Sequence, residues 1–370
     1  MTPEALRGIM LVAGGTGGHI LPAIAFGDWL RREKPHVRID YMSGSRPIER
    51  EIYGASNIEP RVIGITGSPT GVKGVRSLSR WADLIKGVVE AGRALKNFSP
   101  DACVMFGGYA SVPALAAGRA GGIYSVLHEQ NALAGRVTKL ASKLGVKIAS
   151  GWKNCEGLKR SRYTPVGVPI RRMPLMPKET AWDALGLRPP AGSGPVVSVM
   201  TGSLGSGGMA NILTELAGRE SFSSWFFLLL DPESAAPRSA GNIVRLPRVW
   251  DISPLYSVSD MLITRGGAST LTEAIAARKP AVVVPWRGAA DDHQMKNALA
   301  ASGEMTLVWD ERGDSIDELA LKLKRLHGKY TRENGFESNL LYNSGEAAET
   351  NCRRLWSFVV NCRKGEVDVE

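Results

Sequence analysis

The feature that most constrains the fold is an arrangement that occurs twice: a short apolar run, a glycine-rich loop, and a stretch with helical periodicity. Residues 9–13 precede the glycines at 14–18, and residues 196–200 precede the glycine- and serine-rich loop at 201–208. Apolar runs without polar alternation are typical of parallel strands covered on both faces. Each half of the chain is therefore expected to begin with the strand, loop and helix of a parallel α/β sheet.

Apolar runs and helical stretches continue to alternate through both halves. The remaining strands are expected at residues 37–42, 102–106, 124–128, 147–150, 225–230, 243–246, 261–264 and 280–285. Helices are expected at residues 20–32, 80–97, 111–118, 133–144, 271–278, 292–302 and 316–326, with one more beginning near residue 209. This order predicts two parallel sheets with ligand sites at the carboxyl ends of their strands, where open α/β sheets bind their ligands.

Prolines separate the two halves. They are dense between Tyr163 and Pro195, and because neither helix interiors nor central strands tolerate them, we place the connection between domains at residues 165–174. Residues 1–166 then form a first domain and residues 167–345 a second. Residues 346–370 are expected to form a closing amphipathic helix and a polar tail.

Composition excludes several classes of protein. The chain has 370 residues, of which 44% are hydrophobic and 22% charged, as in ordinary globular proteins. No apolar run approaches the roughly 18 residues of a membrane-spanning helix, and the N-terminus lacks a secretion-signal pattern. The four cysteines are scattered, without zinc-site spacing. We therefore expect a cytoplasmic protein with reduced thiols, no metal and no cofactor.

The net charge of +10 favours anionic partners, such as phosphorylated ligands, nucleic acid or an anionic membrane surface. Nucleic acid is not expected, because the chain shows neither zinc-finger spacing nor the aromatic motif of RNA-binding sheets.

The loop GGTGGH at residues 14–19 is the first candidate site. Its glycines let the backbone approach an anion closely, and the helix that follows offers free N–H groups. It matches neither the dinucleotide fingerprint nor the Walker A loop, and a tight structural turn is the alternative. His19 stands where the strand gives way to the helix, so it is a candidate for acid–base chemistry, or simply a helix-capping histidine.

Two more loops follow strands of the same half. The segment GGYAS at residues 107–111 could admit a phosphate or sugar, although tight packing of strand and helix explains its small residues equally well. The segment HEQN at residues 128–131 ends an apolar strand with four polar residues, which is costly unless they serve a site. Their donors and acceptors suit sugar hydroxyls; the alternative is a polar loop.

The second half carries three comparable segments. The loop TGSLGSGG at residues 201–208 is a candidate diphosphate site. The segment RGGASTLTE at residues 265–273 leads into a helix whose first turn is expected to carry Glu273, either to bind two ribose hydroxyls or merely to offset the helix dipole. The segment DDHQMKN at residues 291–297 begins a helix; its carboxylate pair suggests a metal site or simply capping by Asp292.

Taken together, these six segments resemble the peptidoglycan N-acetylglucosaminyltransferase (MurG) family. The resemblance runs in order from Gly14 to Ala298 and includes GGTGGHxxPA, GGYxS and HEQNxxAG. It implies the α/β GT-B glycosyltransferase fold, with two Rossmann-like domains whose parallel sheets face a cleft, the first on the acceptor and membrane side and the second for the UDP-sugar donor. It further implies inverting, metal-free transfer of N-acetylglucosamine from UDP-N-acetylglucosamine to lipid I (undecaprenyl-diphospho-N-acetylmuramoyl-pentapeptide), which forms lipid II.

The resemblance also assigns roles to single residues. It implies that His19 is the general base on the acceptor hydroxyl. The expected substrate contacts are Thr16, Gly17 and Gly18 at the donor sugar and acceptor diphosphate, Asn131 and Arg171 at the donor, Ser203 at the UDP diphosphate, Val249 at uracil through its backbone, Ala268, Ser269, Thr270, Leu271, Thr272 and Glu273 along the nucleotide with Glu273 on the ribose, and Gln294 at a sugar hydroxyl. Thr201 and His293 depart from the family pattern, which often has Gly and sometimes Gln there.

A polyprenyl-linked acceptor requires contact with a membrane. Residues 72–96 mix apolar side chains such as Trp81 and Ile85 with cations such as Lys73 and Arg80, and are expected to dock on the inner leaflet; an ordinary surface helix is the alternative. The resemblance implies a peripheral protein on the cytoplasmic face of the cell membrane, with cell-wall synthesis and division proteins as further partners. Rival hypotheses are a diacylglycerol glycosyltransferase, which would not need the HEQN segment, and a non-catalytic binder of nucleotide sugars.

Overall fold

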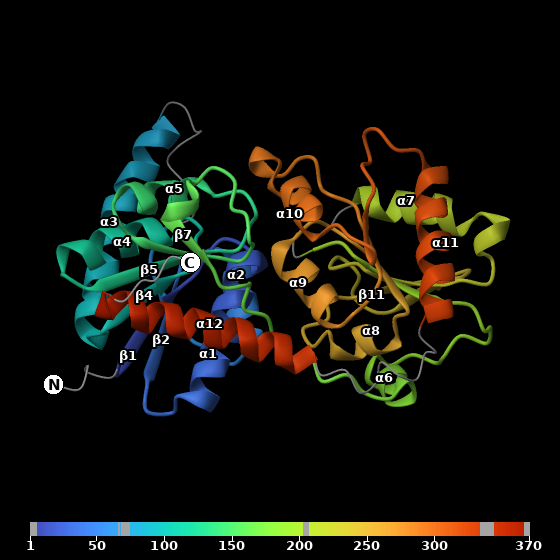
Figure 1. The fold of residues 1–370 in the computed structure, drawn as a ribbon, viewed down its shortest axis with the longest axis horizontal. Helices are drawn as coiled ribbons and strands as arrows, with labels where there is room; N and C mark the ends of the chain where they lie inside the picture. The colour runs from blue at the N-terminus through green and yellow to red at the C-terminus, as the bar shows by residue number, and fades with distance from the viewer. Residues whose placement is uncertain (1–5, 66, 68–74, 203–206, 334–343, 366–370) are drawn as a thin grey trace. The chain divides into compact units, whose positions relative to one another are not determined.

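The computed structural model describes residues 6–65, 67, 75–202, 207–333 and 344–365 (Figure 1). The chain divides into two compact units, one formed by Met1–Arg171 with Glu349–Glu370 and the other by Arg172–Ala348. Each unit contains its own sheet, helices on both of its faces, and its own buried core. The chain therefore has the fold class expected from the alternation of strands and helices.

The sheet of the N-terminal unit has the strand order β3-β2-β1-β4-β5-β6-β7, and all of its described pairings are parallel. Its strands are β1 (Gly8–Val12), β2 (Arg38–Ser43), β3 (Arg61–Val62), β4 (Ala102–Met105), β5 (Tyr124–Glu129), β6 (Lys147–Ser150) and β7 (Tyr163–Pro165). The first strand lies in the interior, where Ile9 pairs with Ile39 on one side and Ala102 on the other. Because the strands are parallel, the loops after β1, β2, β4 and β5 meet at one edge.

Burial on both faces explains the continuous apolar character of β1. Met10 and Val12 belong to the cluster that contains Ala91 of the covering helix α3 (Val75–Phe98). Leu11 faces the other side, where its Cδ1 lies 3.0 Å from the position of a Cβ on Gly27. Glycine at that position of α1 (Gly17–Glu33) therefore lets the helix lie directly on the sheet.

The remaining helices of this unit are α2 (Pro47–Ala55), α4 (Ser111–Ala120), α5 (Arg136–Lys143), the 3₁₀ turn Arg160–Arg162, and α12 (Ser344–Lys364). Helix α12 returns from the end of the chain and lies alongside α1 (Figure 1). Arg32 on α1 forms an ion pair with Glu349 on α12 at 2.7 Å, and the Cys352 thiol lies 3.9 Å from the carbonyl oxygen of Ala25. The last helix thus completes the N-terminal unit.

The sheet of the second unit has the order β10-β11-β9-β8-β12-β13-β14, with its first strand, β8, again in the interior. Its strands are β8 (Val196–Met200), β9 (Phe226–Leu230), β10 (Arg238–Ala240), β11 (Ile243–Leu246), β12 (Met261–Thr264), β13 (Ala281–Val283) and β14 (Thr306–Val308). The described pairings are parallel except that β10 runs antiparallel to β11, which corrects the expectation of a purely parallel sheet.

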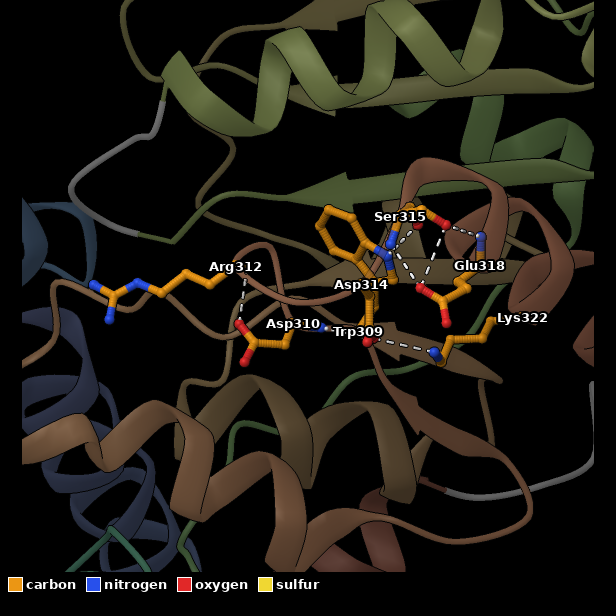
Figure 2. Close-up of polar contacts among 7 residues, drawn as sticks. All are labelled: Trp309, Asp310, Arg312, Asp314, Ser315, Glu318 and Lys322. Carbon is orange, nitrogen blue, oxygen red and sulfur yellow. Dashed lines mark hydrogen bonds and ion pairs between the residues drawn. The ribbon is translucent and has the colours of Figure 1, made fainter.

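The helices of the second unit are α6 (Lys178–Ala184), α7 (Gly207–Ala217), α8 (Ser253–Val258), α9 (Ala268–Ala276), α10 (His293–Ala301) and α11 (Ile316–Glu333), with 3₁₀ turns at Glu220–Phe222 and Ala290–Asp292. Figure 2 shows why α11 begins where it does: the Glu318 carboxylate accepts hydrogen bonds from the backbone N–H and the hydroxyl of Ser315, at 2.6 and 3.3 Å. Ser315 Oγ in turn accepts the N–H of Glu318, so the two residues form a capping box.

The proline-rich stretch contains more regular structure than expected. Pro165 is the last residue of the edge strand β7, and Pro177 is the N-cap of α6. Proline is compatible with both positions, because neither requires its missing N–H within a ladder or helix interior. All four cysteines are buried and free.

Candidate functional site

Two glycine turns lie back to back at the carboxyl edge of the N-terminal sheet. The turn after β4 contains Gly107 and Gly108, both with positive φ, and a Cβ on Gly108 would lie 2.2 Å from the carbonyl oxygen of Gly14 in the turn after β1. A Cβ on Gly14 would in turn lie 2.9 Å from the Cβ of Ala110. Only glycine permits this approach, so both loops have a structural reason for their composition.

The same turn leads into an uncapped helix. Thr16 occupies the N-cap of α1 in an extended conformation, without a side-chain cap, and the first turn contains no acidic residue. Gly17 is buried, Gly18 is exposed, and Thr16 and His19 are partly exposed. The N–H groups and positive end of α1 therefore make a suitable environment for an anionic oxygen next to His19.

His19 is held by a chain of hydrogen bonds from the end of β5. Its Nδ1 lies 2.9 Å from Oε1 of Gln130. The Nε2 of Gln130 lies 3.1 Å from His128 Nδ1 and 2.9 Å from the His128 carbonyl oxygen, and His128 Nε2 lies 2.8 Å from the carbonyl oxygen of Gly167. The structure thus brings together the first and third motifs of the sequence through Gln130, which the sequence analysis did not single out.

His128 is completely buried, and burial lowers its pKa to about 4, although the Gly167 carbonyl and the charge of Glu129 act in the opposite direction. A buried imidazole without water is costly to protonate, so His128 is neutral at physiological pH. Its ring also packs against Phe106, with ring centroids 5.6 Å apart. This histidine therefore supports the site from within and does not offer a proton to a ligand.

Glu49 on α2 contacts both glycine turns, and the sequence analysis missed it. One carboxylate oxygen accepts the N–H of Gly15 at 2.8 Å and the hydroxyl of Tyr109, and the other accepts the hydroxyl of Ser43 at 2.8 Å. Burial, with the hydrogen bond to Glu49, raises the pKa of Tyr109 far above its usual range. Glu49 is 1% exposed, and its local sequence looks like that of a surface helix. No sequence signal distinguishes it.

A second buried carboxylate shapes the loop that carries Asn131. Glu129 accepts the backbone N–H and side-chain amide of Asn131 at 2.9 and 3.0 Å, and its other oxygen accepts the N–H of Gly135 at 2.9 Å and the hydroxyl of Thr138. These bonds hold residues 131–135 as a loop, so α5 begins at Arg136 and not at the expected residue 133. The side chain of Asn131 is consequently fixed in direction and partly exposed.

The corresponding site of the second unit lies where β12 ends and α9 begins. The helix starts at Ala268 with Gly267 as an N-cap that has no side chain, and its first turn contains no acidic residue. The Oγ of Ser269 is buried without a hydrogen-bond partner among the described residues, whereas Thr272 Oγ1 donates to the carbonyl oxygen of Ala268 at 2.9 Å. Leu271 is buried, so a ligand could meet it only through its backbone.

The expected position of Glu273 in the first turn is wrong. Because α9 begins at Ala268, Glu273 lies in the second turn, where it is buried, and offsetting the helix dipole no longer explains it. The capping alternative for Asp292 is also wrong: this residue has a left-handed conformation and makes no capping hydrogen bond, and its carboxylate binds Arg287 at 2.5 Å.

Gln294 joins the start of α10 to the turn before α9. Its Oε1 accepts the N–H of Gly266 at 3.1 Å and that of Trp286 at 2.9 Å, which leaves the amide N–H₂ as the group that can reach a ligand. Asn297, fully buried and not predicted, donates to the carbonyl oxygen of Gly266 at 2.9 Å. A Cβ on Gly266 would lie 2.2 Å from the Gln294 carbonyl oxygen, so the two segments are in backbone contact.

The remaining predicted contacts are more dispersed. Thr201, where the family pattern often has glycine, donates its hydroxyl to the carbonyl oxygen of Leu230 at 3.0 Å, which gives the departure a structural reason. Val249 lies half-buried in the loop between β11 and α8, and Arg171 is the half-buried last residue of its segment of the N-terminal unit. Ser203 lies outside the described residues.

The loop from Trp309 to Ser315 is shown in Figure 2. Two of its carboxylates bind Arg265 and Arg287, which the figure does not draw. Asp310 binds Arg287 at 3.0 Å, and Glu311 binds Arg265 at 3.1 Å. Within the loop, Asp314 accepts the N–H of Asp310 at 3.0 Å and the Lys322 ammonium at 3.2 Å (Figure 2). The carboxylates are thus used in ion pairs, and the described residues contain no cluster of metal-binding side chains.

Comparison with known proteins places these two sites in a family. The glycosyltransferase family 28 N-terminal domain matches residues 9–150, and the C-terminal domain of the same family matches residues 238–338. A UDP-N-acetylglucosamine--N-acetylmuramyl-(pentapeptide) pyrophosphoryl-undecaprenol N-acetylglucosamine transferase of Shewanella putrefaciens is 31% identical over 88% of this chain and 90% of its own. The protein of that name from Phocaeicola vulgatus is 30% identical over 80% and 81%.

Solved structures agree on the fold. MurG of Acinetobacter baumannii has a TM-score of 0.64 at 23% identity and covers 95% of this chain and 99% of its own. The glycosyltransferase of kitacinnamycin has a TM-score of 0.65 at 14% identity, over 98% and 100%. The matched residues, the identity to curated relatives and the two glycine-turn sites lead to one conclusion: this chain is a glycosyltransferase that belongs to the MurG family.

Proposed function

We propose that this protein transfers N-acetylglucosamine from UDP-N-acetylglucosamine to lipid I, which forms lipid II. The observation that carries the proposal is the position of His19, at the start of an uncapped helix, between two glycine turns, and held through Nδ1 by Gln130. The names of the relatives at 30–31% identity supply the substrates. The N-terminal unit would then bind the acceptor and the second unit the donor.

The reaction is a single displacement with inversion. The acceptor hydroxyl oxygen attacks the anomeric carbon, the bond from that carbon to the β-phosphate oxygen breaks, and UDP leaves with the bonding electrons. His19 accepts the proton of the hydroxyl as the new bond forms. The N–H groups of glycine turns and helix N-termini stabilise charge that develops on phosphate oxygens, so this chemistry requires no metal ion.

The features of the second unit suit a UDP-sugar. The uncapped start of α9 offers N–H groups to the diphosphate, with Ser269 beside them. Gln294 presents its amide N–H₂, a donor for a sugar hydroxyl, and Glu273 supplies a carboxylate for the ribose. Ser203 and Val249 complete the proposed donor contacts at the diphosphate and at uracil, with Asn131 and Arg171 at the sugar.

The test is UDP release with and without a lipid I analogue, followed by mass analysis of the product. We expect acceptor-dependent release, and His19→Gln should reduce turnover by roughly 10²–10⁴-fold, the usual contribution of a general base. Turnover with diacylglycerol in place of lipid I would favour the rival glycosyltransferase. Binding of donor without any turnover would favour a non-catalytic protein.

For the membrane, we propose that α3 docks on the inner leaflet, on the cytoplasmic face. Its residues Leu84, Val88 and Ala91 pack in the core, so core packing accounts for one face of the helix. A separate stripe at spacing i, i+4, i+8 is exposed: Trp81 is 48% exposed, Ile85 65% and Val89 49%. The apolar stripe suits a lipid surface, and Lys86 beside it is exposed and adds a cation, although it also pairs with Glu90 at 3.7 Å.

Lys73 lies outside the described residues, so the membrane test uses the stripe itself. Trp81→Glu with Ile85→Glu should abolish sedimentation with vesicles containing anionic lipid, and should preserve turnover of a water-soluble acceptor analogue. Leu321→Glu, on an exposed apolar residue of α11, is the control. Unchanged vesicle binding of the double variant would refute the docking face.

Within the described residues, no helix is long and apolar enough to span a bilayer. Cell-wall synthesis and division proteins are proposed as partners at that surface.

A further inference from the structure

A buried glutamine lies behind His19 and makes contacts that the reaction itself does not require. Gln130 is 1% exposed and His128 is fully buried, whereas His19 is partly exposed. Gln130 contacts both imidazoles through different atoms of its amide group. The orientation of that amide therefore determines which nitrogen of each histidine carries a proton.

The first constraint comes from the backbone of His128. The carbonyl oxygen of His128 can only accept a hydrogen bond, and one terminal atom of the Gln130 amide lies 2.9 Å from it. If that atom were oxygen, two acceptors would face each other inside the protein. The amide nitrogen must therefore occupy this position, and the amide oxygen must face His19 Nδ1 at 2.9 Å.

A second constraint, at the His128 end of this series of hydrogen bonds, gives the same orientation of the Gln130 amide. His128 Nε2 lies 2.8 Å from the carbonyl oxygen of Gly167, which again can only accept, so Nε2 of His128 carries the proton. A neutral imidazole has one N–H, and its Nδ1 must then accept. The Gln130 atom that lies 3.1 Å from His128 Nδ1 must therefore be a donor, so it is the amide nitrogen. Two backbone carbonyls thus orient the same amide independently.

We infer that Gln130 is a positioning residue, which holds His19 in the Nδ1–H tautomer so that Nε2 keeps a free lone pair. The amide oxygen accepts the proton of Nδ1, and Nε2 is left as the only ring atom of neutral His19 that can take a proton. The inference rests on the proposed function only for the identity of that proton, which is the proton of the acceptor hydroxyl. The tautomer itself follows from the hydrogen bonds.

Other parts of the fold hold the glutamine in place. The Trp152 indole N–H donates to the Gln130 backbone oxygen at 2.9 Å. Gly167 provides the carbonyl oxygen at the start of this series of hydrogen bonds, and its φ is +86. It packs against Asn351 of α12, because a Cβ at this position would lie 2.3 Å from Asn351 Oδ1. Asn351 also donates to the carbonyl oxygen of Val168 at 2.9 Å. The carbonyl that orients His128 is therefore itself positioned by the last helix of the chain.

The direct test is the tautomer of His19 in the wild-type protein. The chain has five histidines, and labelling them with ¹⁵N allows each tautomer to be identified from its long-range ¹H–¹⁵N correlations, with His19→Gln used for assignment. We expect Nδ1–H for His19 and Nε2–H for His128, against the averaged pattern of the exposed His36. An Nε2–H or averaged His19 would overturn the inference.

Gln130→Met tests the consequence, because methionine has a similar length and lacks the amide. His19 should change to the averaged pattern of His36, and kcat should fall about tenfold, less than the roughly 10²–10⁴-fold expected for loss of the base, with an unchanged KM for UDP-N-acetylglucosamine. An unchanged His19 spectrum in this variant would overturn the inference. Wild-type turnover of His19→Gln would instead overturn the proposed base and leave the assigned tautomer standing.

Discussion

Acid should destabilise this protein through one buried imidazole. The pKa of His128 is lowered to about 4 by burial, against an ordinary value of 6.5. The unfolded chain therefore binds a proton at this residue between pH 6.5 and 4, and the folded chain does not. The stabilisation is complete above pH 6.5 and is lost as the pH falls toward 4.

The magnitude follows from the same two values. A shift of about 2.5 units corresponds to roughly 3 kcal/mol in full, at about 1.4 kcal/mol for each unit. Between pH 7.5 and pH 5, the part that is lost is about 2 kcal/mol, because this interval covers the protonation of the unfolded chain but ends above the pKa of the folded protein. Such a loss is a substantial share of the stability of an ordinary domain.

Urea unfolding at pH 7.5 and pH 5 measures this loss in the wild type, in His128→Gln and in His36→Gln. Other groups also titrate in the interval, so the informative quantity is the difference between proteins in their loss of stability. His128→Gln should lose about 2 kcal/mol less than the wild type on acidification, and the exposed His36 variant should behave as the wild type. Equal losses in all three proteins would refute the argument that His128 is buried and neutral.

Three further predictions concern the loops of the site. Gly108→Ala should destabilise the protein by roughly 2 kcal/mol or more and reduce turnover, because the new Cβ meets a backbone oxygen at a positive φ; wild-type stability by urea unfolding would contradict this. Glu49→Ala should cost about 3 kcal/mol, since it leaves three donors without their acceptor, whereas Glu51→Ala on the same helix serves as the exposed control. Glu129→Gln should raise the KM for the donor more than it lowers kcat, because it weakens the loop that carries Asn131; a change confined to kcat would count against that role.

The sequence predicted the architecture well because its strongest signals come from burial. The strands at residues 147–150, 196–200, 243–246 and 261–264 were predicted with their observed bounds, since apolar residues dominate three of them and the sheet buries most residues of each. The short edge strand β10 was not predicted, because all three of its residues are exposed and it lacks an apolar pattern. Helix α6 was missed because the surrounding prolines, which in fact occupy its boundary, were taken to exclude a helix.

The candidate site shows where sequence patterns stop being informative. Glycine loops are visible in a sequence because backbone geometry demands a particular residue type, as at Gly108. Glu49 is not visible in this way, and Gln130 is visible only as one member of the HEQN segment, because their roles depend on partners that are 34 and 111 residues away in the chain. The displacement of Glu273 to the second turn of α9 has a local cause, since the helix also includes the small residues Ala268, Ser269 and Thr270.

The path of α12 has a consequence for how the polypeptide matures. The N-terminal unit receives its final element only after the whole second unit has been synthesised, because Glu349–Glu370 belong to it. Leu355 and Val359 are completely buried, so a nascent chain leaves the apolar surface that they cover exposed until α12 has been synthesised. A stop codon anywhere between residue 171 and Leu355 would therefore damage the half of the enzyme that was translated first.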